Sequence, residues 1–580
     1  MPITAITLQN FKGIKDPVRI ELRPITLLFG PNSAGKSTII QALHYAHEVL
    51  ERGNTNPDQT LYGGDTIDLG GFQNFVHKHD KSLPITIRID MDLEKESLPE
   101  YYREDDYFIF KELGGEEIPY EDMTRGVKNA WVEISVRWSE LVNRPVVNKY
   151  EVGINGEMLA RLVSSDDGRQ ISISELNCLN PLFFGGKGIT KNIIVHFKLL
   201  KIVFEGAYLG KKADRISRIE AMKEEMEEAD DESTDESERT LEEKLGTLYL
   251  ALSRLVKNSE GSGIYKPINL PLQKSALPLW GESLHLDPEI WEDEVDWEEV
   301  QGLLYALSSL IVGPGELVRN ALRKFIYLGP IRKIPSRNYR PKLSPRPSNW
   351  ANGQEAWDIL CRADEPFLKK VSEWLSRKQH LNIGYKIVRR DYLELDTTNP
   401  IWVNVLQDRL LDESLDLKSE LKSLPKHSRL FLWDETNEIE VQTEDVGTGI
   451  SQVIPVVVAG LTAKTGFVAI EEPEAHVHPG VQVSLGDLFI HQIADHPDVI
   501  FLLETHSEHL MLRFLRRIRE TNENELPPGK QGLTPDQLSI YFCEKGESGI
   551  ALTSIRVDKD GEFVDKWPKG FFDERLPEIM

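Results

Sequence analysis

The sequence predicts an α/β fold: a mixed sheet flanked by helices, joined to an antiparallel β subdomain and split by a large α+β insert. Three observations predict this fold. A hydrophobic strand at 25–29 runs into a Gly-rich loop and then into a helical pattern. Two more apolar strands, at 467–470 and 499–503, lie far downstream and end in acidic residues. Between these parts, segments 85–93 and 131–138 alternate apolar and polar side chains, which is typical of antiparallel strands with one buried face.

Composition narrows the class of protein. The chain has 580 residues, enough for several domains, and its 40% hydrophobic and 28% charged content is ordinary for a globular protein. Three cysteines, Cys178, Cys361 and Cys543, lie far apart without metal-type spacing, so we expect a reduced, cytoplasmic protein. No apolar run approaches the roughly 18 residues of a membrane span, and no secretory signal precedes the first strand. We therefore expect no contact with a membrane.

Charge is unevenly distributed along the chain. The net charge is -26, which argues against broad electrostatic binding to nucleic acid or anionic lipid. A dense acidic block at 220–243 is either a solvated helix end with a linker or a partner-binding segment. A basic, Pro-rich connector at 326–349 could form a phosphate-binding edge or a surface loop that balances acidic neighbours. Both pairs of alternatives stay open at the level of sequence.

The loop after the first buried strand has the spacing of a phosphate-binding P-loop, Gly30-x4-Gly35-Lys36-Ser37. Its glycines let successive backbone N–H groups turn inward around phosphate, and the following helix presents its N-terminus to negative charge. Lys36 would reach the β- and γ-phosphates, and the Ser37 hydroxyl would bind Mg²⁺. The sequence therefore predicts that the chain binds a nucleoside triphosphate, with ATP and Mg²⁺ as the expected ligands.

Acidic residues follow each of the two downstream strands. Glu471 and Glu472 come directly after the strand at 467–470, where the first acid would hold Mg²⁺ and the second would orient and deprotonate the attacking water. His506 follows the strand at 499–503 and could contact the γ-phosphate or that water; a structural histidine is the alternative.

A second Gly-rich turn, within 445–460, leads into an apolar helix and would expose backbone N–H groups to an anion. One subunit does not need two phosphate-binding turns for one nucleotide. Two subunits packed head-to-tail do, because each can supply its second turn to the nucleotide of the other. The sequence thus predicts a homodimer or a higher oligomer.

Together these segments resemble a known family. LQNFKGI before the P-loop, IEEPEAHVHP and ETHSEHLMLR are similar to the ABC-type ATPase heads of the SMC/RecF/OLD group, and most similar to OLD-like AAA ATPases of bacteria and phage-defence islands. The C-terminal WPKGFFDE resembles the ending of a subfamily with a short C-terminal domain. The resemblance implies an ABC-type P-loop ATPase head that hydrolyses ATP, dimerises and controls a protein effector, such as a nuclease, in antiviral defence.

The resemblance also assigns residues to roles. The P-loop residues that would hold the phosphates and Mg²⁺ are Gly30, Asn32, Ser33, Ala34, Gly35, Lys36, Ser37 and Thr38. The metal would be bound by Ser37, Gln73 and Glu471, and the catalytic residues would be Glu472, His506 and Lys36. The residues that would clasp the partner's ATP are Gly447, Gly449, Ser451 and Gln452. Gly447 replaces the usual signature serine, so the γ-phosphate contact would come from backbone N–H groups or from Ser451. Residues 474–479 would cross the dimer interface.

The expected division of the chain has six parts. They are an N-terminal ATPase lobe (1–90), a β-rich part (91–195), a helical insert with the acidic block (196–325), a connector with an α+β segment (326–440), a C-terminal ATPase lobe (441–525) and a short C-terminal β domain (526–580). Local patterns within these parts predict helices at 244–256 and 300–312 and an amphipathic helix at 354–376. They also predict a hairpin turn at Asn155-Gly156 and a hairpin at 431–442.

Besides an ATPase that controls an effector, the sequence leaves two alternative functions open. A DNA-repair or DNA-end-binding ATPase would bind DNA through the basic connector or through Arg513, Arg516, Arg517 and Arg519. A stand-alone OLD-like nuclease would need a Toprim domain after the ATPase. Segment 538–548 resembles a Toprim start, and Asp558 and Asp560 supply an Asp-x-Asp pair. The remaining chain is far shorter than the roughly 100 residues of such a domain, and 549–563 has the pattern of a β-hairpin with an Asp-Gly turn. We expect no intrinsic nuclease.

Overall fold

The computed structural model describes most of the chain outside the central insert. The described residues are 3–53, 55–56, 69–101, 124, 126–177, 180, 182, 268–285, 297–337, 339–341, 344, 347–406, 417–546 and 549–568. The acidic block at 220–243 and the helix expected at 244–256 lie outside them. Within the described residues, the search for a helix long and apolar enough to cross a membrane finds no candidate.

A six-stranded sheet carries the P-loop. Its strands, in spatial order, are β10 (Ile326–Leu328), β14 (Gly466–Glu471), β15 (Val499–Glu504), β3 (Ile25–Phe29), β16 (Leu538–Gly546) and β17 (Gly549–Ser554). The first five are parallel, and β17 closes the sheet in an antiparallel hairpin with β16. All five residues of β3 are buried, because a central parallel strand is covered on both faces.

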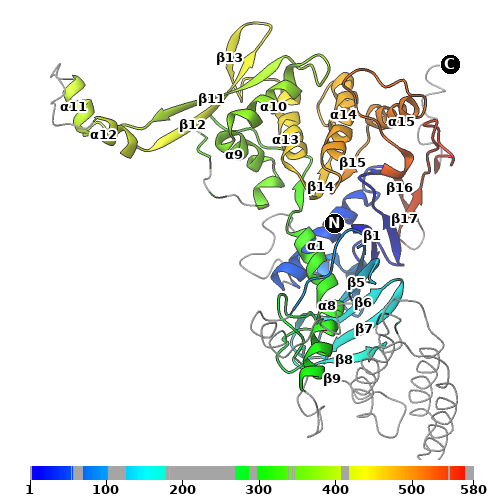
Figure 1. The fold of residues 1–580 in the computed structure, drawn as a ribbon. Coiled ribbons are helices and arrows are strands. Elements are labelled where there is room, and N and C mark those ends of the chain that lie inside the picture. Colours follow the sequence, from blue (N-terminus) through cyan, green and yellow to red (C-terminus); the bar gives the residue numbers. More distant parts are fainter. Residues whose placement is uncertain are drawn as a thin grey trace, which may run out of the picture.

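The two faces of this sheet belong to two hydrophobic cores. On one face, Leu28 of β3 packs with α1 (Lys36–Arg52) and with the strands of the antiparallel sheet. On the other face, Leu27 packs with α13 (Thr448–Thr462), α14 (Pro479–Asp495) and α15 (Glu508–Asn522). Figure 1 shows these helices above the sheet and the antiparallel strands below it. Alternate residues of one strand thus join two layers, as the period of a β-strand requires.

The antiparallel subdomain is an eight-stranded sheet. Its strands, in spatial order, are β2 (Val18–Glu21), β1 (Ile3–Gln9), β4 (Ile85–Asp92), β5 (Asn129–Ser139), β6 (Arg144–Ile154), β7 (Glu157–Ser164), β8 (Ile171–Leu176) and β9 (Ile268–Asn269). Buried and partly exposed residues alternate strictly along β4, as the sequence pattern predicts. The turn expected at Asn155 and Gly156 joins β6 to β7, and both residues have the positive φ of a tight hairpin turn.

The long helix α8 (Trp297–Leu322) packs against this sheet and against α1. It confirms the helical pattern expected at 300–312 and continues past an internal proline, Pro314. The Tyr150 hydroxyl on β6 donates a hydrogen bond to the Ile311 carbonyl at 2.7 Å, which fixes the helix to the sheet.

A third, three-stranded sheet extends away from the body, as Figure 1 shows. It comprises β11 (Tyr385–Leu393), β12 (Lys426–Asp434) and β13 (Ile439–Gln442), and the predicted hairpin at 431–442 is confirmed as β12–β13. Its outer end carries α11 (Pro400–Leu406) and α12 (Leu417–Ser423). The remaining short helices are α2 (Phe72–Phe75), η2 (His77–His79), η5 (Pro347–Trp350) and η6 (Pro535–Gln537).

The amphipathic helix expected at 354–376 is two helices, α9 (Gln354–Arg362) and α10 (Glu365–Ser376). The break comes at Asp364, whose side chain caps α10 by accepting from the Phe367 N–H. Asp at this position stabilises a new helix start more than it stabilises a helix interior.

Two of the expected domain boundaries do not follow the sheets. β10 belongs to the expected connector, yet it pairs with β14. β16 and β17 belong to the expected C-terminal domain, yet β16 pairs with β3 along its length. Six consecutive buried residues at the start of β16 explain the difference, since such a run fits a strand that is covered on both faces. In the segment expected to form a hairpin at 549–563, β17 pairs with β16 instead. The expected Asp-Gly turn is flanked by one antiparallel bridge, between Val557 and Phe563.

Candidate functional site

The P-loop leaves β3 and enters α1 in the geometry expected of a phosphate-binding loop. Gly30, Ser33 and Gly35 all have positive φ, so the chain turns tightly between strand and helix. A Cβ on Gly30 would lie 2.2 Å from the Cys543 carbonyl oxygen of β16, so only glycine fits beside that strand. No side chain caps the N-terminus of α1. Because the first N–H groups of a helix lack intrahelical partners, this end is suited to phosphate.

Lys36 joins the P-loop to the histidine expected in the site. Its side chain is only 3% exposed, and Nζ donates to the carbonyls of Gly30 at 3.1 Å and Pro31 at 3.2 Å. Nζ also lies 3.0 Å from His506 Nε2, so the structure brings together two predicted catalytic residues that are 470 positions apart. Burial and the nearby Lys36 charge lower the pKa of His506, so the ring is neutral and its Nε2 accepts a hydrogen bond from the Lys36 ammonium group.

Ser37 points at an acid to which the sequence analysis gave no role. Its hydroxyl donates to Glu504 Oε2 at 2.7 Å, and Glu504 is the last residue of β15. Glu504 pairs in register with Glu471 at the end of β14, so the two carboxylates leave the same edge of the sheet. The signal for Glu504 was present in the sequence, as an acid that ends an apolar strand, but only the strand register places it beside the predicted metal site.

The acids at this edge favour a bound cation. Burial raises the pKa of Glu471 to about 7, and the Glu504 carboxylate contributes to the same shift. Burial also raises the pKa of Glu504. Two buried carboxylates and a serine hydroxyl are oxygen donors of the kind that Mg²⁺ prefers. The residues present therefore fit a magnesium ion, which would relieve the repulsion between the acids.

Glu472, the predicted base, is held in a strained backbone conformation. Its φ is 45°, in the left-handed region that a residue with a side chain rarely adopts. Its N–H donates to the Glu504 carbonyl at 2.7 Å, and its own carbonyl accepts from Arg332 at 3.0 Å. Strain of this kind costs about 1–3 kcal/mol and is concentrated at functional sites. Two neighbours thus fix the main chain that presents this carboxylate.

Glu474 fixes the loop that carries His506. The Glu474 carboxylate accepts from the Thr505 hydroxyl and from the His506 N–H, each at 2.7 Å. It is buried, and burial raises its pKa. The sequence analysis placed Glu474 only in a loop at the dimer interface; its contacts make it a positioning residue for the histidine.

The second Gly-rich turn differs from expectation. We call residues 447–449 the signature turn; Gly447 caps α13, and Gly447 and Thr448 are exposed. Ser451 and Gln452 were expected to clasp a partner's ATP, but both side chains are buried. The Ser451 hydroxyl donates to the Thr448 carbonyl at 2.9 Å, and Gln452 bonds to the main chain of Arg332. They are buried because every residue of α13 from Ser451 to Leu461 is buried, whereas Gly447 and Thr448 at its start are exposed.

Gly449 has a packing role in that turn. A Cβ at this position would lie 2.5 Å from the His476 carbonyl oxygen, so the turn rests directly on the loop after β14. Gln73, the last predicted metal-binding residue, lies on α2 with its side chain exposed. Its carbonyl bonds to His79 Nδ1. Among the described contacts, none joins Gln73 to Ser37, Glu471 or Glu504.

A cavity of about 410 Å³ opens beside the P-loop. It is lined on one side by Ser33, Gly35 and Thr38, and on the others by Gly13, His77 and Lys78 and by the β16–β17 hairpin. The Ile550 N–H of β17 donates to the Gly13 carbonyl at 2.8 Å, which closes the hairpin onto this cavity. The volume of the cavity and its position beside the P-loop suit the base and sugar of a nucleotide.

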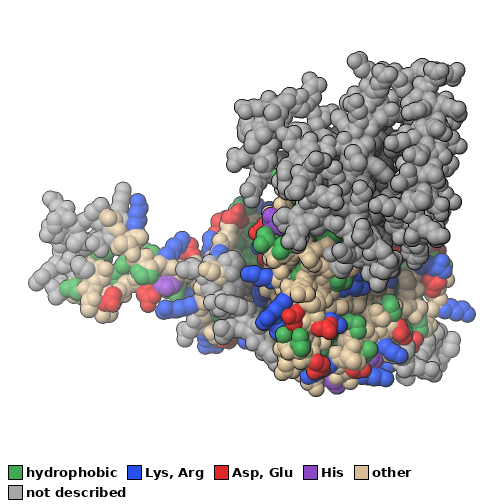
Figure 2. Space-filling view, turned by 90° about the horizontal axis from the view of Figure 1, so that it is seen from below, with side chains coloured by type: hydrophobic (Ala, Val, Ile, Leu, Met, Phe, Trp, Pro, Cys, Tyr) green, Lys and Arg blue, Asp and Glu red, His purple; other side chains and the backbone are tan. Residues whose placement is uncertain are grey.

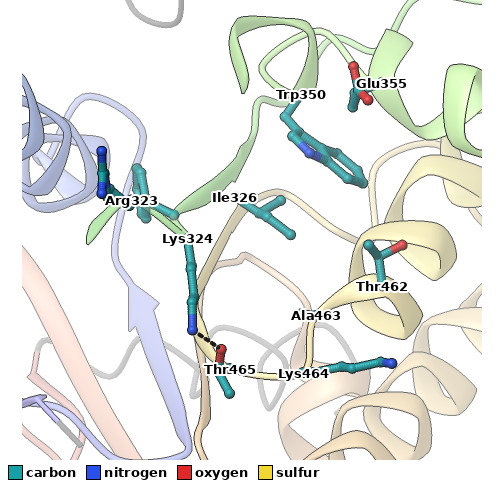
Figure 3. Close-up of a pocket in the computed structure, with 10 residues that line it drawn as sticks. Arg323, Lys324, Ile326, Trp350, Glu355, Thr462, Ala463, Lys464 and Thr465 are labelled. Atoms are coloured by element: carbon teal, nitrogen blue, oxygen red, sulfur yellow. Dashed lines mark hydrogen bonds between the residues drawn. The ribbon is translucent and has the colours of Figure 1, made fainter. Parts of the chain in front are cut away.

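Two other features are not part of this site. A cavity of about 340 Å³ at the β10 edge is lined by Trp350, Ile326 and Lys324, whose ammonium bonds to the Thr465 hydroxyl at 3.1 Å (Figure 3). It contains no P-loop residue. On α1, His44, His47 and Glu48 place possible metal-binding atoms within 4.8 Å of one another. Because Arg52 already pairs with Glu48 at 2.9 Å, we interpret this group as an ion-paired helix face.

Comparisons with known proteins agree with the geometry. A family model described as "AAA ATPase domain" matches residues 1–328 and 359–511. A second model, described as "Protein of unknown function (DUF3696)", matches residues 533–580, which include β16 and β17. No curated protein matches the chain.

Solved structures of SMC heads are similar to the chain at low sequence identity. An SmcHead bound to the C-winged helix domain of ScpA is 10% identical, with 96% of this chain and 98% of that chain covered and a TM-score of 0.34. An Smc head domain from Pyrococcus furiosus, with an extended coiled coil and bound to the C-terminal domain of ScpA, is 12% identical, with coverage of 100% and 99% and a TM-score of 0.34. The SMC head domain from Thermotoga maritima is 8% identical, with coverage of 96% and 100% and a TM-score of 0.34. TM-scores this low give no basis for assigning function.

Proposed function

The chain belongs to the AAA ATPase domain family, and from this premise we propose that it hydrolyses ATP at the edge of the six-stranded sheet, with Glu472 as the base. One observation carries the proposal. Lys36 and Ser37 at the start of α1 contact His506 and Glu504, which follow a strand far downstream. The P-loop and the acidic residues at the ends of β14 and β15 would thus form one site.

Each group has a task that its surroundings support. Lys36 and the N–H groups at the start of α1 would hold the phosphates, while Ser37, Glu471 and Glu504 would hold Mg²⁺. A bound Mg²⁺ would neutralise charge on the phosphate oxygens. Glu472 would orient a water molecule and take its proton as the bond to the γ-phosphorus forms and the bond to ADP breaks.

His506, which is neutral and held by Glu474 beside Lys36, would contact the γ-phosphate. Its Nε2 now accepts from the Lys36 ammonium; once phosphates draw Lys36 away, the neutral ring can carry its proton on Nε2 and donate it to a γ-phosphate oxygen. Gln73 has no described contact with this group, and we retain it as a metal ligand only if the loop around it moves.

We further propose that two copies bind head-to-tail and share their sites. Gly447 and Thr448 of the signature turn are exposed at the N-terminus of α13, and the nucleotide of its own subunit already has the P-loop. The exposed Thr448 hydroxyl and the backbone N–H groups, rather than the Ser451 side chain, would meet the partner's γ-phosphate. From the sequence resemblance, the dimer would switch a protein effector, such as a nuclease, in cytoplasmic antiviral defence.

The two alternative functions receive no support from the described residues. Of the arginines expected to bind DNA, Arg332 and Arg517 are buried, and Arg337 pairs with Glu444 and Asp445. On the coloured part of the face in Figure 2, basic and acidic side chains intermingle. DNA that stimulates ATP hydrolysis at low salt would favour the DNA-repair alternative.

The Asp-x-Asp pair expected of a nuclease has a structural task. The Asp558 carboxylate accepts from the N–H groups of Asp560 and Glu562 and so caps a turn. Incubation of the pure protein with plasmid and Mg²⁺ or Mn²⁺ tests that alternative, and cleavage would favour it.

The test of the proposed function uses Glu472→Gln and Lys36→Ala. We expect both variants to lose phosphate release by at least about 100-fold, since each removes a group that acts in the transition state. Glu472→Gln should still bind ATP and accumulate as a dimer in size-exclusion chromatography with light scattering, whereas Lys36→Ala should not. The control is Glu440→Gln, which removes only a surface ion pair with Arg390. Unchanged hydrolysis in Glu472→Gln would contradict the assignment.

A further inference from the structure

The basic connector contains one arginine that is not at the surface. Arg332 follows β10 and is 2% exposed, whereas Arg337 and Arg340 in the same connector are exposed and pair with surface acids. From its sequence, this connector is expected to be a phosphate-binding edge or a surface loop. Arg332 is neither, because its guanidinium points into the body of the ATPase.

The Arg332 guanidinium reaches the main chain at the end of β14. Nη2 donates to the Glu471 carbonyl at 2.7 Å and to the Glu472 carbonyl at 3.0 Å. These are the two peptide units that carry the predicted metal ligand and the predicted base. The Glu472 N–H is held from the other side by the Glu504 carbonyl, so the strained conformation of Glu472 is fixed from both sides.

Arg332 is also tied to the helix behind the signature turn. Nη1 donates to the Gln452 carbonyl at 3.3 Å. The Gln452 side chain returns two bonds to the Arg332 main chain: Oε1 accepts from its N–H at 3.2 Å, and Nε2 donates to its carbonyl at 2.7 Å. Gln452 lies one helical turn into α13, which begins at Thr448. A continuous set of hydrogen bonds therefore joins the signature turn to Glu472.

Burying the charged Arg332 guanidinium costs free energy. Burial lowers the pKa of Arg332 to about 10, so it remains charged at neutral pH. Its hydrogen-bonded partners are main-chain carbonyls rather than a carboxylate, and among the described residues its Nε has no hydrogen-bond partner. A buried charge held in this way is weak evidence for stability, since an apolar side chain of similar volume often packs as well. It is better explained by a need to hold two carbonyls in a fixed direction.

We propose that Arg332 and Gln452 are positioning residues that couple the signature turn to the catalytic carboxylate. When the turn docks on the nucleotide of a second copy, α13 shifts or stiffens, and Arg332 transmits the change to the peptide units of Glu471 and Glu472. The Glu472 carboxylate then takes the direction needed to activate water. The inference rests on the proposed function, in which Glu472 is the base and the signature turn meets the partner's ATP.

The first test is Arg332→Lys, which keeps the charge but loses the planar fork that can reach both carbonyls and Gln452. We expect kcat to fall by about 10- to 100-fold, because a base about 1 Å out of place loses this much. KM for ATP and the affinity for a non-hydrolysable analogue should stay within about twofold, since Arg332 does not contact the P-loop. The matched control is Arg337→Lys in the same connector, which should leave kcat and KM unchanged.

Two further measurements separate positioning from simple structural support. Arg332→Ala should regain part of its kcat when millimolar guanidinium is added, and equal sodium chloride should not restore it. Gln452→Leu leaves Arg332 in place but removes the side-chain bonds to its main chain; it should lower kcat and weaken ATP-dependent dimerisation together. Gln452→Leu decides the case if Arg332→Lys does not fold.

The outcomes distinguish this inference from the proposed function. If the wild type hydrolyses ATP and Glu472→Gln does not, but both Arg332→Lys and Gln452→Leu keep kcat within twofold, the coupling is wrong and the catalytic assignment stands. A rise in KM without a fall in kcat would also overturn the coupling. If Glu472→Gln hydrolyses ATP normally, the proposed function itself fails.

Discussion

Two buried clusters of charged side chains within the described residues differ in the balance between acids and cations. The first, which we call the helix cluster, joins Asp487 on α14 to Arg517 on α15 and to Lys530. Arg517 donates to Asp487 at 2.8 and 3.0 Å, and Lys530 donates at 2.7 Å. Burial opposes the charged form of Asp487, but these hydrogen bonds outweigh it and lower its pKa.

The second, the nucleotide cluster, consists of Lys36, Glu471, Glu474, Glu504 and His506. Here burial prevails, and the pKa values of Glu471, Glu474 and Glu504 are all raised. One lysine faces several acids, and it donates partly to carbonyls instead. Burial of charge alone therefore does not mark a functional site. A cluster in which each acid is paired with cations holds two helices together, whereas one in which acids outnumber cations is suited to a metal ion and phosphates.

The largest expected difference between the clusters is in catalysis. Glu504→Gln removes a carboxylate that would hold Mg²⁺ near Ser37, and we expect turnover to fall by at least about 100-fold even at saturating Mg²⁺. Asp487→Asn, the matched change in the helix cluster, should leave turnover per folded molecule within about twofold. Phosphate release measured against Mg²⁺ concentration tests both. Equal losses of turnover in the two variants would contradict the proposal that the nucleotide cluster, and not the helix cluster, serves catalysis.

The next largest effect is on stability, and here the change in the helix cluster should have the larger effect. Asp487→Asn leaves Arg517 and Lys530 without their shared carboxylate and should lower the free energy of unfolding by about 3 kcal/mol. Urea denaturation without nucleotide measures this loss. A loss below about 1 kcal/mol would mean that Glu520, which also pairs with Arg517, compensates for the missing charge.

A smaller effect of opposite sign is expected for Glu471→Gln. Its pKa of about 7 in the folded protein lies above the ordinary value of 4.5, so the folded state holds a proton that the unfolded state releases. The resulting stabilisation is present below pH 4.5 and is lost as the pH rises through 7. Without metal, the stability advantage of Glu471→Gln over the wild type should grow by about 2.5 kcal/mol between pH 5 and pH 8. A gap that does not change with pH would contradict the raised pKa.

The smallest effect is expected at the surface of α15. Arg516 pairs with Glu520 at 2.6 Å with its own side chain more than half exposed. Arg516→Ala should change the free energy of unfolding by at most about 0.5 kcal/mol and leave ATP hydrolysis unchanged. A large loss of DNA-stimulated hydrolysis in this variant would instead revive the DNA-binding alternative.

Local motifs were predictable from the sequence, and residues defined by register or packing were not. The P-loop, Glu471, Glu472 and His506 each follow a strand in one short segment, so spacing alone predicts them. Glu504 also ends a strand, but its place opposite Glu471 depends on the pairing of β14 with β15.

Packing decides the remaining differences. The pairing of β16 with β3 joins segments more than 500 positions apart, and no local pattern encodes it. The burial of Ser451 and Gln452 depends on the packing that surrounds α13, and the burial of Arg332 depends on its contacts with α13 and β14. A basic connector therefore resembles a surface loop until its neighbours are known.

Proton release on ligand binding shows whether Mg²⁺ and phosphates complete the nucleotide cluster. Calorimetry at pH 7 would use Mg²⁺ with a non-hydrolysable ATP analogue in buffers of different ionisation enthalpy. Because Glu471 has a pKa of about 7, it is about half protonated before binding, and a cation beside it should expel about half a proton. We predict that release in the wild type and its loss in Glu471→Gln. Binding without proton release, or equal release in both proteins, would contradict the proposal that Mg²⁺ binds beside Glu471.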